Sequence, residues 1–387
     1  MRGEHFIRSM ESNEGNKENH PEIPHVSLYD LSNTSDRRAL HNAVKNYPGN
    51  RGVLPRSFSG DRALKRAQER DIFVNNFQRH LADRAKLDHP PGYFAGREKE
   101  LDNYVRHNDK AENSVVAEFS WKREGRFVRL PQEEDFYQII SSRETLIIPE
   151  DVQDTLRKTK IAIAGMGVGA SIGYLLVQSG AQNLAVADGG AVDLHDFNRY
   201  PHSDVSKIGE NHAIDFTKFA YETNPYAVIE CYPYNVATQE KPGVVPIHTL
   251  LADADIVIEE VDNLPMKLAI RHAAKEAGIP LVMGTDIGKS AIVHFEYPDD
   301  EPFGGRLSAS DLDSFQQRLN FEEITDLATK VIGERNIPDN LLRRANNKGL
   351  PYWPQDGGAA RKSAAGVRDA IIDYLKGDVV PEEKVIL

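Results

Sequence analysis

A glycine-rich turn between an apolar strand and an apolar helix is the feature that most constrains this fold. Residues 160–164 form a short apolar run, Gly165, Gly167 and Gly169 follow it, and residues 171–178 are typical of an apolar helix. Glycines let the backbone turn tightly and approach a ligand, and the N-terminus of the next helix favours negative charge. We therefore expect a strand–turn–helix unit that binds phosphate or ribose.

Strand-like and helix-like patterns alternate beyond this turn. Strands are expected at residues 183–187, 227–232, 255–260, 280–284 and 290–297, with helices at 208–223 and 264–277. This alternation predicts an α/β fold with a Rossmann-like, doubly wound and mainly parallel sheet. Asp188 ends the second strand, where a carboxylate can accept hydrogen bonds from ribose hydroxyls. NAD(P)-dependent oxidoreductases share these features, so the pattern alone leaves that class open.

The sequence divides into four parts. Residues 1–60 are rich in Asn, Ser, Pro and Arg and are expected to be largely irregular, with the first ~20 disordered. Residues 61–135 are predicted to form an α+β extension, with an amphipathic helix at 61–88 and a hairpin of residues 115–121 and 126–130. The nucleotide-binding domain is expected at residues 136–300. A mostly helical part follows at 301–387, with helices at 311–321, 323–335 and 367–376.

Composition excludes several other classes. The formal net charge of −12 argues against nucleic-acid binding, which needs a basic face. No apolar run approaches the ~18 residues of a membrane span, and residues 1–20 are too polar for a secretory signal, so we expect a cytoplasmic protein. The single cysteine, Cys231, lies in a predicted strand, where a packed thiol is favoured over a nucleophile.

Motifs beyond Asp188 have no purpose in an ordinary dinucleotide fold. The segment Asp193-Leu-His-Asp-Phe-Asn-Arg199 follows the second strand directly, and Asn224-Pro225 and Asp262-Asn263 come later in that order. With the glycine turn, this series resembles the ThiF/MoeB/ubiquitin-E1 superfamily of adenylyltransferases over about residues 136–300. Residues 127–131, 142–144, 259–262 and 353–355 most resemble a branch found fused to nitroreductase-like domains.

This resemblance implies a role for each matching residue. Gly165, Gly167 and Gly169 would shape the loop over ATP, and Asp188 would hold the ribose. Arg199, with Asn198 beside it in the same motif, would contact the triphosphate, where a guanidinium suits the developing pyrophosphate charge.

The remaining implied roles concern the metal and the partner subunit. Asp262, next to Asn263 in the same nucleotide-binding motif, would bind Mg²⁺ or orient the phosphates. Arg143 matches the arginine that reaches into the partner's site in dimeric relatives, so the resemblance implies a homodimer.

Three positions depart from the family pattern. His212 stands where relatives usually carry a phosphate-binding lysine, so either protonated His212 or nearby Lys207 is expected to supply that charge. Gly190 replaces the second acid of the usual Asp-x-Asp, and Asp196 replaces an asparagine. An added carboxylate near polyphosphate is unfavourable unless a cation screens it. These departures leave open a second interpretation, in which the chain is an inactive, E1-like interaction subunit.

The function expected first is an ATP- and Mg²⁺-dependent adenylyltransferase. It would join AMP to a carboxylate of a peptide or small molecule, or of a small carrier protein, and release pyrophosphate. Because the chain has one cysteine, a catalytic-cysteine relay is not expected. The alternatives are an NAD(P)-dependent oxidoreductase and the inactive E1-like subunit.

Overall fold

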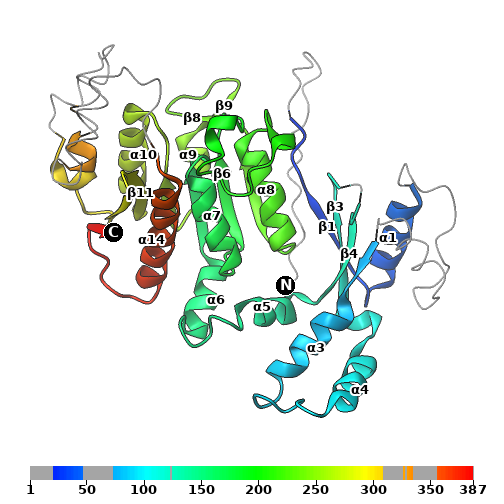
Figure 1. Cartoon of the computed structure of the whole chain (residues 1–387). Coiled ribbons are helices and arrows are strands. Elements are labelled where there is room, and N and C mark those ends of the chain that lie inside the picture. The colour runs from blue at the N-terminus through cyan, green and yellow to red at the C-terminus, as the bar shows by residue number, and fades with distance from the viewer. Residues whose placement is uncertain are drawn as a thin grey trace.

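A seven-stranded sheet forms the centre of the molecule (Figure 1). The computed structural model describes residues 21–46, 73–122, 124–307, 326, 329–333 and 355–386. The strands lie in the order β13-β12-β11-β10-β5-β6-β7. Their bounds are β5 Lys160–Ala164, β6 Asn183–Ala187, β7 Val228–Tyr232, β10 Ile256–Glu259, β11 Leu281–Ile287, β12 Ser290–Glu296 and β13 Glu383–Ile386.

Five of these strands are parallel, and the antiparallel pair β12 and β13 completes one edge. Chain order reverses between β5 and β10, which pair directly although about 90 residues separate them. In open sheets of this kind, ligands bind beyond the carboxyl ends of the strands at such a reversal. The predicted α/β fold with a mainly parallel sheet is therefore confirmed.

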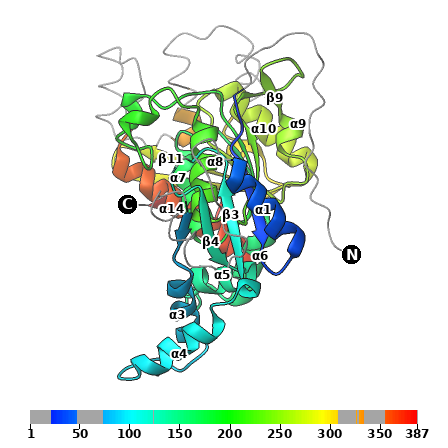
Figure 2. The ribbon, with the colours of Figure 1, turned by 90° about the vertical axis from the view of Figure 1, so that its right-hand side faces the viewer.

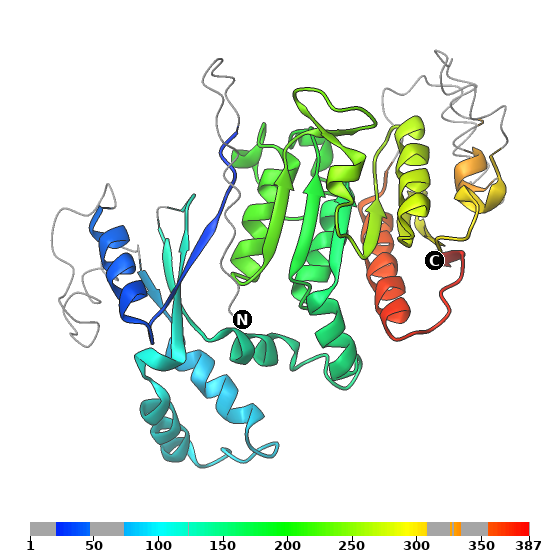
Figure 3. The same cartoon turned by 180° about the vertical axis from the view of Figure 1, so that it is seen from behind.

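Helices cover both faces of the sheet (Figures 1 and 3). On one face lie α6 Glu150–Lys158, α7 Gly169–Gln178, α8 His212–Thr223 and α14 Gly357–Leu375; on the other lie α9 Ile247–Leu250 and α10 Leu264–Ala277. Alternate side chains of a strand point to opposite faces. Ile161 and Ile163 accordingly pack in the first layer, and Ala162 and Ala164 in the second. Both layers consist of buried apolar side chains, which fix where the strands end.

A separate four-stranded sheet lies beside this core (Figure 2). Its order is β1-β3-β4-β2, with β1 Val26–Asp30, β2 Phe73–Asn75, β3 Ser114–Phe119 and β4 Phe127–Pro131. Helices α1 Thr34–Asn46, α3 Phe77–Leu87 and α4 Glu98–Asn108 accompany it, and α5 Glu133–Ser141 leads to the central sheet. The hydroxyl of Tyr226 donates to the carbonyl of Pro131 at 2.5 Å and ties the two parts together.

The described residues test most of the predicted elements. Strands 160–164 and 183–187 and helix 264–277 are confirmed residue for residue, and the predicted hairpin is the antiparallel pair β3 and β4. The predicted helix 311–321 and the disorder of the first 20 residues fall outside the described residues, as does most of helix 323–335.

Two expectations about the N-terminal extensions are wrong. Residues 26–46 are not irregular, because β1 gains its backbone hydrogen bonds from distant β3. Residues 73–75 form a strand rather than part of a helix, because they pair with β4, and α3 begins only at Phe77. The C-terminal part is predicted to be mostly helical; among its described residues, α14 is accompanied by one short strand, β13, which joins the central sheet. Among the described helices, none combines the length and apolar character that crossing a membrane requires.

Candidate active site

The glycine turn leads from β5 into α7 and is shaped by close packing. Gly165 has a φ of +89°, and a Cβ atom there would lie 2.6 Å from the backbone oxygen of Glu260. A Cβ atom at Gly169 would lie 3.1 Å from Ile163. Around Gly167 the space is open, so its backbone faces the cavity. The first and third glycines therefore permit close packing, and the second leaves room for a ligand.

Asp188 follows β6 and is bound to this turn through its carboxylate. Oδ2 accepts a hydrogen bond from the N–H of Met166, and Oδ1 accepts one from the N–H of Gly190, both at 2.6 Å. Burial opposes ionisation of the group. The nearby His212 ring and the hydrogen bonds from the N–H groups of Gly190 and Met166 outweigh burial and hold the pKa of Asp188 below its usual range. The carboxylate is thus charged and fixed in direction at the end of the strand.

The segment after Asp188 forms a short 3₁₀ helix, η2 Leu194–Asp196, that starts with a reciprocal cap. The Asp193 side chain binds the backbone of Asp196, and the N–H of Asp193 donates to Oδ2 of Asp196 at 2.9 Å. Asp196 is consequently 4% exposed. Its Oδ1 accepts from Nη2 of Arg199 at 2.9 Å, which directs the guanidinium along the cavity wall.

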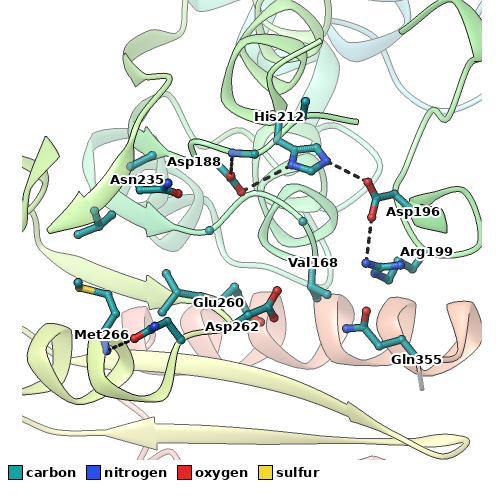
Figure 4. Close-up of a pocket in the computed structure, with 18 of the residues that line it drawn as sticks. Val168, Asp188, Asp196, Arg199, His212, Asn235, Glu260, Asp262, Met266 and Gln355 are labelled. Atoms are coloured by element: carbon teal, nitrogen blue, oxygen red, sulfur yellow. Dashed lines mark hydrogen bonds and ion pairs between the residues drawn. The ribbon is translucent and has the colours of Figure 1, made fainter. Parts of the chain in front are cut away.

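His212 begins helix α8 and lies between two carboxylates (Figure 4). Its Nδ1 is 3.8 Å from Oδ2 of Asp188, and its Nε2 is 3.3 Å from Oδ2 of Asp196. Burial would favour the neutral ring, but the two carboxylates raise the pKa of His212 above its usual value. When it is protonated, His212 supplies a positive charge in the wall that also contains Asp188 and Arg199.

The opposite wall comes from the end of β10 and the start of α10 (Figure 4). Glu260 accepts from the N–H of Gly284 at 2.6 Å, and burial raises its pKa to about 8. Asp262 is exposed to the cavity. Asn263 lines it too, while its side-chain oxygen caps α10 by accepting from the N–H of Met266 at 3.0 Å.

These walls enclose a cavity of about 580 Å³, within the range of small-molecule sites. Of the predicted site residues, the cavity is lined by Gly165, Gly167, Asp188, Arg199, His212, Asp262 and Asn263. Gln355, just before α14, closes the cavity from the C-terminal side, and its Nε2 donates to Oδ1 of buried Asp286 at 3.3 Å. Segments about 190 residues apart in the chain thus meet at one edge of the sheet.

Four predicted residues lie outside the lining. Gly169 packs beneath the turn, and Asn198 donates from Nδ2 to the carbonyl of Gln355 at 2.9 Å. Lys207 is paired with buried Asp215, with Nζ 2.7 Å from Oδ1, and does not reach the cavity. Arg143 is exposed in the turn after α5.

Sequence analysis missed two of the polar residues that line the cavity. Asn235 opens the short strand β8 Asn235–Ala237, and it packs so closely on Gly189 that a Cβ atom there would be 2.7 Å from its side chain. His195 lies within the motif before Arg199 but was given no role. No local sequence signal marks Asn235, because only tertiary packing brings β8 to the end of β6.

This arrangement can bind a nucleotide and its counterion. Backbone N–H groups and one fixed acid lie at the β5–β6 side, and two cations lie beyond them. Among the described residues, no group of three or more His, Cys, Asp or Glu side chains could hold a metal alone. Mg²⁺ commonly takes one or two carboxylates and completes its shell with phosphate and water, so Asp262 fits an ion that arrives with ATP.

The fold and the site together define a protein of the Rossmann-like α/β class with a polar cavity at the carboxyl edge of its sheet. A model described as the ThiF family matches residues 141–335, half of the chain, so the chain belongs to the ThiF family. The match spans the glycine turn, Asp188, Arg199, His212 and Asp262.

Individual relatives are distant. The uncharacterized protein MT1398 of Mycobacterium tuberculosis (strain CDC 1551 / Oshkosh) is 26% identical over 250 residues, which are 61% of this chain and 33% of that protein. The sulfur carrier protein adenylyltransferase of Thermus thermophilus is 24% identical over 156 residues, 38% of this chain and 55% of that protein. The chain thus spans between a third and a little over half of the length of these relatives, and it is distantly homologous to ThiF-family adenylyltransferases.

A crystal structure of E. coli MccB with MccA-N7isoASN is similar in fold. It has a TM-score of 0.48 at 15% identity, and the similarity covers 79% of this chain and 83% of that one.

Proposed function

We propose that this chain is an ATP-dependent adenylyltransferase that forms an acyl-adenylate on a carboxylate and releases pyrophosphate. The observation that carries the proposal is the cavity itself. Asp188 and the glycine turn, two cationic side chains and Asp262 line the same space at the carboxyl edge of the sheet. A nucleotide placed along it has its ribose at Asp188 and its phosphates against His212 and Arg199.

The chemistry needs positioning and charge rather than a protein nucleophile. A carboxylate oxygen of the substrate attacks the α-phosphorus of ATP, and the bond from that phosphorus to the pyrophosphate oxygen breaks. Arg199 and protonated His212 stabilise the negative charge that develops on the leaving pyrophosphate. Bound beside Asp262, Mg²⁺ would neutralise part of the phosphate charge.

Lys207 is a poor candidate for the missing lysine. Its Nζ is held 2.7 Å from Asp215, whose other oxygen accepts from the hydroxyl of Tyr200 at 2.9 Å. Releasing Lys207 would leave a carboxylate that is 1% exposed without its counter-charge. His212 already lines the cavity, so it takes this role in the proposal.

A cysteine relay within this chain has little support. Cys231 lies in β7, and burial raises the pKa of its thiol to about 11. A thiolate is the nucleophile in thioester formation, and at neutral pH this side chain is almost entirely thiol. In the proposal, the acyl group therefore passes from AMP directly to a substrate nucleophile. The acyl substrate is a peptide, a small molecule or a small carrier protein, and the name of the Thermus relative refers to such a carrier.

The active form in this proposal is a homodimer that joins through the turn after α5. Leu146 is fully exposed there and Ile147 is 74% exposed, beside exposed Arg143. Large apolar side chains next to each other on a surface commonly mark an interface. Glu144 in the same turn is paired with Arg368 of α14 at 2.8 Å, which fixes the turn against the core. The proposed placement in the nitroreductase-associated branch rests on the motifs named above and affects no residue role.

Exchange of labelled pyrophosphate into ATP, measured beside nicotinamide-nucleotide binding, tests this function. Carboxylate-dependent exchange with a panel of peptides and amino acids supports adenylation. NADH binding without exchange would support the oxidoreductase alternative, for which ThiF-family membership offers no support. Binding of neither nucleotide would favour the inactive E1-like subunit.

A further inference from the structure

The three positions at which the sequence departs from the family pattern lie together in space. A Cβ atom at Gly190 would be 3.0 Å from Oδ1 of Asp188 and 3.2 Å from Nδ1 of His212. At the other edge of the His212 ring, Nε2 is 3.3 Å from Oδ2 of Asp196. At these separations a Cβ atom at 190 requires the side chain of Asp188 or His212 to shift by a few tenths of an ångström. The absent side chain at Gly190 and the histidine at 212 are therefore structurally linked.

The carboxylate of Asp196 has two cationic neighbours. Oδ1 accepts from Arg199 at 2.9 Å, and Oδ2 lies 3.3 Å from Nε2 of His212. The N–H of Asp193 also donates to Oδ2, so the carboxylate cannot turn away without losing the cap of η2. The Asp196 side chain is nearly inaccessible to water, which strengthens both interactions.

The charge of this wall depends on the protonation of His212, and His195, whose Nε2 is 3.5 Å from Oδ1 of Asp196, is a second histidine in the same wall. Asp188 and Asp196 contribute two negative charges, and Arg199 with protonated His212 contributes two positive charges. With neutral His212 the wall has a net charge of −1, which repels polyphosphate. The groups that face His212 or its partners are Asp188, Asp196, Arg199, His195, Tyr200, Asp215 and Lys207. Since Lys207 and Asp215 neutralise each other, the balance rests on the five side chains that line the cavity, Asp188, Asp196, Arg199, His195 and His212.

We propose that Gly190, Asp196 and His212 act as one unit, in which Asp196 is a positioning residue that holds His212 protonated in the cavity wall, making nucleotide affinity depend on pH. The proposal rests on the proposed function, because it places ATP phosphates at this wall. The proposal adds two statements to that function. Gly190, Asp196 and His212 together keep a positive charge at the nucleotide site, and a lysine at position 212 would remove the dependence of nucleotide affinity on pH.

The expected pH profile follows from the sign of the His212 shift. Its pKa is raised in the folded protein, so the charge is present at low pH and is lost as the pH rises through that value. Above it, the affinity for nucleotide falls by a factor that approaches about tenfold per pH unit. Replacing Asp196 by asparagine removes one of the two carboxylates that favour the cation. The fall in affinity should then begin at a lower pH.

Calorimetric titration with Mg²⁺ and AMPCPP, a nonhydrolysable ATP analogue, tests this proposal by measuring the nucleotide affinity at several pH values between pH 6 and pH 9. His212→Lys should bind with an affinity that varies little across this range, and Asp196→Asn should shift the profile to lower pH. The ratio of wild-type to His212→Lys affinity cancels the titration of the nucleotide itself. His248→Lys, at an exposed histidine of α9 outside the cavity, is the matched control and should keep the wild-type profile.

The coupling has its own test. Gly190→Asp should weaken binding more in the wild type than in the Asp196→Asn/His212→Lys background, because the histidine that it displaces is absent there. A wild-type profile parallel to that of His212→Lys, or equal costs of Gly190→Asp in both backgrounds, would overturn the unit and leave the proposed function intact. If the wild type binds no AMPCPP at any pH, both proposals are overturned. Thermal unfolding of each variant establishes that it is folded.

Discussion

Arg199 and Asp196 form an ion pair at the cavity wall, with Nη2 2.9 Å from Oδ1 and the guanidinium side chain 17% exposed. The same guanidinium donates from Nη1 to the carbonyl of His195 at 2.9 Å. Two fixed contacts hold the arginine in place before any nucleotide binds. Preorganised charge of this kind costs little reorganisation when phosphate charge develops.

Removal of this guanidinium should therefore affect catalysis more than folding. For Arg199→Ala we expect kcat/KM for pyrophosphate exchange to fall by about a hundredfold or more, since the charge on the leaving pyrophosphate loses its counterion. Arg199→Lys should recover part of the loss, because the lysine keeps the positive charge but lacks the planar guanidinium that can make two parallel hydrogen bonds. Arg106→Ala on α4, exposed and outside the cavity, is the control. Exchange at the wild-type rate in Arg199→Ala would remove Arg199 from the mechanism.

Asp188 should contribute to stability in a pH-dependent way. Asparagine at this position can accept from only one of the N–H groups of Met166 and Gly190 and presents its own donor to the other. We expect Asp188→Asn to lower the free energy of unfolding by about 1–3 kcal/mol at pH 7. Because the folded-state pKa is lowered, the carboxylate stabilises the protein above the unfolded pKa of about 3.9, and this contribution is lost as the pH falls through the folded value.

Urea denaturation of the wild type and Asp188→Asn at pH 7 and in a series of acid buffers well below pH 4 measures this difference. The gap in unfolding free energy should be larger at pH 7 and should shrink in acid. A gap that is constant with pH would show that Asp188 is not held ionised by its partners.

Two glycines with similar φ angles allow the cost of backbone strain to be distinguished from the cost of a steric clash. Gly165 has a φ of +89°, and a Cβ atom there would meet the Glu260 backbone at 2.6 Å, whereas Gly209 has a φ of +86° and nothing within 4 Å. Alanine at Gly209 should cost about 1 kcal/mol for the left-handed backbone alone, and alanine at Gly165 should cost clearly more. Equal unfolding free energies for the two variants would contradict the tight contact between the glycine turn and Glu260.

A trans contribution of Arg143 can be tested by mixing two inactive variants. If Arg143 enters the partner's site, Arg143→Ala and Arg199→Ala homodimers are both impaired, but a mixed dimer has one site with both arginines intact. Subunit exchange should then restore up to about a quarter of wild-type exchange activity, since half of the dimers are mixed and each has one intact site. No recovery, together with a dimer confirmed by light scattering, would assign Arg143 to its own subunit or to no site.

The sequence predicts an element well when the residues that stabilise the element are close to it in the chain. Strands 160–164 and 183–187 and helix 264–277 were found residue for residue, because apolar runs bounded by polar or glycine residues define them locally. Strand β1 was missed, because its pairing partner β3 lies about 90 residues away. Strand β13 is stabilised in the same way by β12.

Prediction of the site shows the same division. Asp188, Arg199 and Asp262 could be placed because ordered motifs mark them, and the structure brings all three to one cavity. The link between Gly190, Asp196 and His212 could not be read from the sequence, where each looked like a separate defect. It requires knowing that a Cβ atom at 190 would lie 3.2 Å from the His212 ring.

A crystal structure of the chain with Mg²⁺ and AMPCPP tests the central claim most directly. The account predicts a ribose within hydrogen-bond distance of Asp188 and phosphate oxygens in contact with Arg199 and His212. It also predicts a Mg²⁺ ion next to Asp262. A nucleotide bound elsewhere, or one in this cavity that leaves Asp188 and Arg199 without contact to it, would contradict the account.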